Sequence, residues 1–165
     1  MVNPNDANRG EAQARRLESV AEHLRELLRR PEIEARLRTA PGEDEWNAME
    51  ILGHLVEMIP FWLAQSRDLI DATGEPPRFG RTLEDAGRLA GVERGASADP
   101  TELLRQLQEE TRAAAESIRR LSSAESAKAG IHSRRGEMTV NDIVETFIVA
   151  HAEDHLAQLK AALQS

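Results

Sequence analysis

The segment from Thr139 to Leu163 places two histidines on the apolar face of a predicted helix. Projected at about 3.6 residues per turn, its apolar side chains form one stripe, with His151 and His155 in the middle. Histidines four residues apart stand one helical turn above each other, so both imidazoles are expected to face the core. A buried imidazole needs partners for its ring nitrogens. The sequence therefore predicts either a shared cation or polar partners from another helix.

The composition is typical of a single helical domain. The 165 residues are dominated by alanine, leucine, glutamate and arginine, and we expect one domain over residues 1–165 with residues 1–10 as a flexible start. The absence of cysteine excludes disulfides and thiolate metal ligands. A net charge of −8 argues against a nucleic-acid partner. No apolar run of about 18 residues and no signal peptide are present, so we expect a cytoplasmic protein without a membrane partner.

Helical spacing of apolar side chains predicts four long helices. They cover about residues 11–38, with Pro31 ending or kinking the first near residue 30, then 45–72, 99–121 and 139–163. The long connection 73–98 allows the second and third helices to run parallel, and one or two helical turns capped by Thr82 are expected within it. No segment indicates a strand. We predict an all-α fold, a four-helix bundle with a long crossover between helices 2 and 3.

The second predicted helix supplies a third candidate imidazole, His54, which lies among apolar side chains. Glu50 and Glu57 lie one turn before and after it, as carboxylates that orient a ligand or as solvent-facing charges. The apolar arc of this helix covers more than half of its circumference, so it must pack against several neighbours. It is either central in the bundle or part of an interface, and we expect a homodimer.

Three imidazoles from two helices, His54, His151 and His155, suit a metal site with an open coordination position. Without sulfur ligands, zinc or nickel is the favoured divalent metal. Glu50, Glu57 and Asp154 are candidates for orienting an imidazole or moving a proton, and no catalytic residue is assigned among them. The alternative is a set of core histidines that bond to neighbouring carbonyl groups.

Three further side chains receive structural interpretations. Trp46 and Trp62 are expected to anchor the core. His132 is expected to be a surface loop histidine, with the lining of the site's entrance as the alternative. The zinc-protease motif is excluded, because Ala152 follows His151 where that motif requires glutamate.

Three stretches resemble the DinB superfamily, also described as DinB/YfiT-like metalloenzymes. They are residues 46–62, residues 130–140, and the ending His151-x-x-x-His155-Leu-x-Gln158-Leu159. The resemblance extends over about residues 14–163. It implies a four-helix bundle with a long crossover, a divalent metal held by His54, His151 and His155, and frequent homodimers.

The resemblance also implies a function. Some members of the superfamily are thiol-dependent transferases that use bacillithiol, mycothiol or glutathione, including maleylpyruvate isomerases. Our interpretation is a metal-dependent S-transferase or hydrolase that acts on a small electrophilic substrate, with a low-molecular-weight thiol as a candidate cosubstrate. The alternative is a non-catalytic bundle that binds or sequesters a small molecule or a protein partner.

Overall fold

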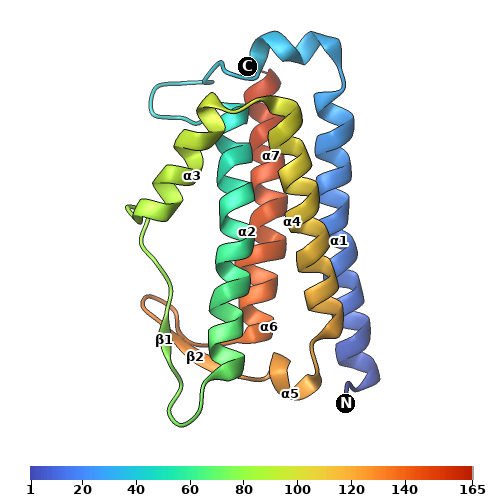
Figure 1. Cartoon of the computed structure of the whole chain (residues 1–165), viewed down its shortest axis with the longest axis vertical. Coiled ribbons are helices and arrows are strands. Elements are labelled where there is room, and N and C mark those ends of the chain that lie inside the picture. The colour runs from blue at the N-terminus through green and yellow to red at the C-terminus, as the bar shows by residue number, and fades with distance from the viewer. Residues whose placement is uncertain (165) are drawn as a thin grey trace.

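The long helices of the chain pack side by side as a four-helix bundle (Figure 1), here in a computed structural model that describes residues 1–164. The first three are α1 (Pro4–Leu28), α2 (Ala48–Asp71) and α4 (Pro100–Arg120). The fourth is continuous through α6 (Val140–Ile143), the π-helical segment η2 (Val144–Val149) and α7 (Ala150–Gln164). Helices α2 and α4 run in the same direction, opposite to α1 and α7 (Figure 1). The predicted bundle with a long crossover is confirmed.

Side-chain caps fix where the helices begin. The predicted capping box of the last helix is present, since Asp142 N–H donates to Thr139 Oγ1 and Thr139 N–H donates to the Asp142 carboxylate. Helix α1 begins at Pro4, so the predicted start of the first helix at about residue 11 is wrong, while the flexibility of residues 1–10 stays a prediction. The reason for the earlier start is a cap, because the Asn3 side chain accepts from the Asp6 N–H at 2.8 Å.

The connection between α2 and α4 is more ordered than predicted. It contains strand β1 (Arg78–Phe79) and helix α3 (Ala86–Ser97), and the cap of α3 is Asp85 instead of Thr82. The Asp85 carboxylate accepts the Arg88 N–H at 3.0 Å, and an acidic side chain also complements the helix dipole.

Helix α3 packs against α2 through glycines, so the two backbones touch. A Cβ added to Gly95 would lie 2.7 Å from Gly53 Cα and closer still to the Met49 carbonyl oxygen. The wide apolar arc of α2 therefore contacts α3 as well as α4 and α7. These neighbours belong to the same chain, so the arc does not require a second copy. The homodimer stays a prediction.

A small sheet lies at one end of the bundle, which makes the expectation of no strand wrong (Figure 1). Strand β2 (Ala129–His132) pairs parallel to β1 and antiparallel to β3 (Gly136–Thr139), after the short helix α5 (Ser123–Ser126). The strands are two to four residues long, too short for an alternating pattern to be visible. Their pairing sets Phe79 opposite His132.

The core fills the space between the four long helices. Its largest fully buried side chains include Leu17, Leu24, Leu52, Leu55, Met58, Leu107, Ile143 and Ile148. The short helix η1 (Pro31–Arg36) comes after α1 and begins at Pro31, where the sequence predicts that the first helix ends or kinks. Among residues 1–164, no helix combines the length and apolar character that crossing a membrane requires.

Candidate metal centre

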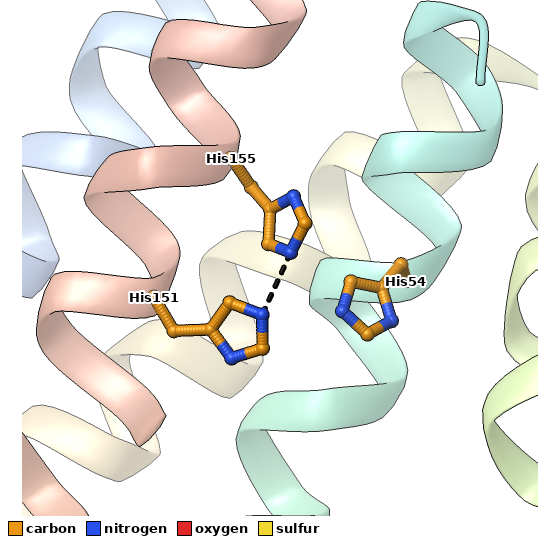
Figure 2. Close-up of side chains that lie close together, drawn as sticks. All are labelled: His54, His151 and His155. Atoms are coloured by element: carbon orange, nitrogen blue, oxygen red, sulfur yellow. Dashed lines mark hydrogen bonds between the residues drawn. The ribbon is translucent and has the colours of Figure 1, made fainter. Parts of the chain in front are cut away.

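The three predicted ligands converge between α2 and α7. His54 projects from α2 toward His151 and His155 on α7 (Figure 2), and one ring nitrogen of each lies within 4.8 Å of the others. His54 is fully buried, whereas His151 and His155 are half-buried. The spacing of four residues thus places both α7 imidazoles against a single imidazole of the neighbouring helix.

His54 is the most constrained of the three. Both of its ring nitrogens are buried without a hydrogen-bond partner. Burial, followed by the nearby charges of His155 and His151, lowers the pKa of His54 to about 2, so the ring is neutral near pH 7. A buried polar atom left without a partner costs free energy. A neutral imidazole in this setting is suited to donate a lone pair to a metal ion.

The two α7 histidines are oriented by acceptors on the same helix. His151 Nδ1 lies 3.3 Å from the Phe147 carbonyl oxygen, and His155 Nδ1 lies 2.8 Å from Gln158 Oε1. These oxygens can only accept, so each Nδ1 carries the proton and each Nε2 presents a lone pair. Hydrogen bonds of this kind are the usual partners of metal-binding imidazoles.

The two Nε2 atoms lie 2.8 Å apart and face each other (Figure 2). Burial lowers the pKa of His151 to about 4 and also lowers that of His155, although the bond to Gln158 opposes the latter shift. The Nε2···Nε2 hydrogen bond needs a proton on one of these atoms, so one neutral ring must give up its Nδ1 proton and its Nδ1 bond to form it. A cation shared by both Nε2 atoms removes this conflict and keeps both Nδ1 bonds.

The donor set fits a divalent metal with few adjustments. Zinc–nitrogen bonds of about 2.0–2.1 Å in tetrahedral geometry separate the ligand nitrogens by about 3.3 Å. This value lies between the 2.8 Å of the two α7 nitrogens and the 4.8 Å within which all three ligand nitrogens lie. Three neutral imidazoles leave a fourth position for water or substrate. The residues His54, His151 and His155 could therefore hold a metal ion.

None of the three candidate carboxylates bonds to a histidine. Glu50 belongs to the capping box of α2, where its Oε2 accepts the Asn47 N–H at 2.8 Å. Glu57 binds Arg81 through both carboxylate oxygens. Asp154 is exposed, and its charge only weakly raises the pKa values of the α7 histidines. The groups that orient the imidazoles are the Phe147 carbonyl and Gln158.

A cavity of about 270 Å³ opens beside the histidines, and His54 and His151 line it. Its aromatic wall is formed by Trp62, Phe147 and His132, with ring centroids of Trp62 and Phe147 4.3 Å apart and those of His132 and Phe147 5.1 Å apart. The expectation of a surface His132 is wrong, because the pairing of β2 with β1 buries this ring at 7% exposure. His132 lines the cavity, as in the alternative interpretation.

The two tryptophans both border the site. Trp62 is buried in the core as predicted, and it also lines the cavity. Trp46 is only half-buried, and its ring centroid lies 5.2 Å from that of His54 and 6.2 Å from that of His155. Trp46 therefore covers the histidine cluster as well as packing against the core.

Sequence reasoning missed the arginines of the cavity and the role of Gln158. Arg81 and Arg88 lie in the crossover, while Arg134 and Arg135 lie in the turn after β2. Neither segment has a helical or alternating period that predicts where its side chains point. Gln158 had a signal, since a polar residue three positions after His155 lies on the same face of the helix.

The fold and the site define a four-helix bundle that carries a cluster of three histidines between two of its helices. The chain belongs to the DinB superfamily, whose family model matches residues 13–159. Among solved structures it is similar to YfiT from Bacillus subtilis, described as "a probable metal-dependent hydrolase with an unusual four-helix bundle topology". The two share 17% identity with a TM-score of 0.76 over 99% of this chain and 89% of that chain, which shows a common fold. No curated protein matches the sequence significantly.

Proposed function

We propose that this protein is a metal-dependent enzyme that acts on a small electrophilic substrate, with His54, His151 and His155 as the metal ligands. One observation carries the proposal. The buried His54 has no hydrogen-bond partner for either ring nitrogen, and it faces two imidazoles whose Nε2 lone pairs also point inward. The description of YfiT as a metal-dependent hydrolase supports the same reaction class.

A divalent zinc or nickel ion bound there would supply Lewis-acid chemistry, because it lowers the pKa of a water or thiol in its open position. The residues of the chain prepare this position. The Phe147 carbonyl and Gln158 hold the α7 rings in one tautomer, so that no proton has to leave them before a metal binds. The Trp46 ring packs with its centroid 5.2 Å from that of His54, and Trp62 lines the cavity beside the histidines.

Two reactions are consistent with this site. Hydrolysis requires water as the nucleophile, whereas S-transfer requires a low-molecular-weight thiol such as bacillithiol, mycothiol or glutathione. The cavity volume of about 270 Å³ greatly exceeds the roughly 30 Å³ of one water molecule, which leaves room for an organic substrate. A screen of chromogenic esters and electrophiles, with and without each thiol, separates the two reactions.

Metal analysis of protein purified without a nickel column tests the site. We expect about one equivalent of zinc or nickel in the wild type and its loss in the His54→Ala and His151→Ala variants. His23→Ala is the matched control, since His23 lies exposed on α1. A wild type that neither contains nor takes up metal would remove the enzyme interpretation and favour a non-catalytic bundle that binds a small molecule or a partner.

A further inference from the structure

Four arginines surround the cavity beside the histidines, although the chain carries a net charge of −8. Arg81 and Arg88 approach from the crossover, and Arg134 and Arg135 from the turn between β2 and β3. No acidic side chain lines the cavity within the described residues. A positive cavity in a negatively charged protein indicates that the site is arranged for an anion.

The charge of Arg81 is already compensated. Its guanidinium binds both oxygens of Glu57 at 2.6 and 2.7 Å and lies 3.3 Å from Asp85. Arg88, Arg134 and Arg135 differ, because none of them forms an ion pair with a carboxylate of residues 1–164. Three guanidinium groups at the cavity therefore have donors available for a ligand.

Arg88 is held in place without a direct ion pair, and the carboxylates of Glu57 and Asp85 only partly offset its charge. Its Nη1 donates to the Leu83 carbonyl at 2.8 Å, and its guanidinium lies 5.0 Å from the centre of the Trp46 ring. Burial and the positive charge of Arg81 lower the pKa of Arg88. An anion bound beside Arg88 would oppose both effects.

The turn that carries Arg134 and Arg135 is tied to the cavity wall. The backbone N–H groups of both residues donate to His132 Nδ1, at 3.1 and 3.2 Å. The Arg135 guanidinium lies 5.3 Å from the centre of the Phe147 ring. These contacts fix the backbone of the turn and place the Arg135 guanidinium before any ligand binds, which lowers the entropy cost of binding.

We propose that the substrate carries an anionic group, a carboxylate or a phosphate, which is bound by Arg88, Arg134 and Arg135. The aromatic wall of Trp62 and Phe147 then receives a flat apolar part of the same molecule, and its reactive atom faces the three histidines. This assignment of a substrate class rests on the proposed function.

The test measures binding to the full-length, metal-free protein, so that coordination by a metal cannot account for the result. Phenylphosphonate and benzoate serve as anionic aromatic probes, and benzyl alcohol serves as the neutral control, all at constant ionic strength. Calorimetry gives the affinity, and tryptophan fluorescence reports the location, because the two tryptophans of the chain both border the site.

We expect at least one anionic probe to bind about ten-fold more tightly than benzyl alcohol, and the preferred probe distinguishes phosphate from carboxylate. Arg88→Gln and the double variant Arg134→Gln/Arg135→Gln should each weaken that probe about ten-fold. Arg112→Gln removes the same charge from an exposed position on α4 and should leave the affinity within about two-fold.

Equal affinity for anionic and neutral probes would overturn the assignment, as would equal losses in Arg88→Gln and Arg112→Gln. Zinc uptake is measured separately on the same samples. Zinc binding without anion selectivity overturns the substrate class alone. Anion selectivity without zinc binding supports the arginine site and removes the proposed metal chemistry.

Discussion

Replacing Glu57 by glutamine tests the energetics of the ion pair that borders the cavity. Arg81 and Glu57 form two hydrogen bonds, and their side chains retain only 7% and 13% of their exposure to solvent. The substitution leaves the Arg81 charge buried with a weaker partner. Breaking a buried pair from one side costs about 3–5 kcal/mol. We expect the lower end of this range, because Asp85 lies 3.3 Å from the Arg81 guanidinium and still opposes its charge.

Urea denaturation followed by circular dichroism measures this cost from the shift of the midpoint at constant slope. Glu102→Gln is the control, because Glu102 pairs with Arg105 on the surface of α4 and should leave the midpoint nearly unchanged. Adding Arg81→Met to Glu57→Gln should recover part of the loss, since it removes the uncompensated charge. A midpoint for Glu57→Gln no lower than that of Glu102→Gln would refute the reasoning.

Three further predictions follow from the histidine cluster and the contact of α3 with α2. Between about pH 6.5 and 4 the unfolded chain binds protons on His54 and His151 that the folded chain does not, because burial lowers the pKa values of these groups to about 2 and about 4. The metal-free protein therefore loses stability as the pH falls through this range, and His54 contributes about 2 kcal/mol of the loss at pH 5. Urea midpoints at pH 7.5 and 5 should therefore differ less in His54→Leu than in the wild type, and equal differences would contradict the assignment. Gln158→Leu removes the acceptor of His155 Nδ1–H and should weaken zinc binding about ten-fold or more in a titration against a fluorescent chelator; an unchanged affinity would show that Gln158 does not orient the ring. Gly95→Ala should destabilise the protein by about 1–3 kcal/mol, measured by urea denaturation. Gly10→Ala in α1 is the control and should not destabilise it, because the nearest atom to an added Cβ lies at 3.4 Å; equal effects of the two substitutions would argue against the close contact of α2 and α3.

The bundle and the histidine cluster were predictable, because both depend on local periodicity. Apolar side chains three and four residues apart define the face of a helix, and His54, His151 and His155 all lie on such faces. Because the two helices pack through these faces, the imidazoles meet in the core. The conformations of the connecting loops do not have to be known for this prediction. The Thr139 cap follows from the same local rules.

The remainder of the site depends on contacts between distant segments. His132 is buried because β2 pairs with β1, about fifty residues earlier in the chain, and because its ring packs against Phe147 of the last helix. Strands of two to four residues give no periodic signal for this pairing. Arg88 faces the cavity because glycines let α3 approach α2 closely. Neither the strand pairing nor the helix approach can be recognised from neighbouring residues alone.

The π-helical segment η2 ends directly before the helix that carries His151 and His155. Its backbone hydrogen bonds run from an N–H to the carbonyl five residues earlier, as from the Ala150 N–H to the Glu145 carbonyl. The segment therefore contains more residues per turn than an α-helix. Deleting one residue there would let the segment close into regular α-helix, so the helix that follows would keep nearly the same rotation about its axis. Both imidazoles would then still face His54. The same deletion in a regular α-helical turn would instead rotate the following residues by about 100°, so the π-helical stretch is where this helix can change length and keep its histidine cluster.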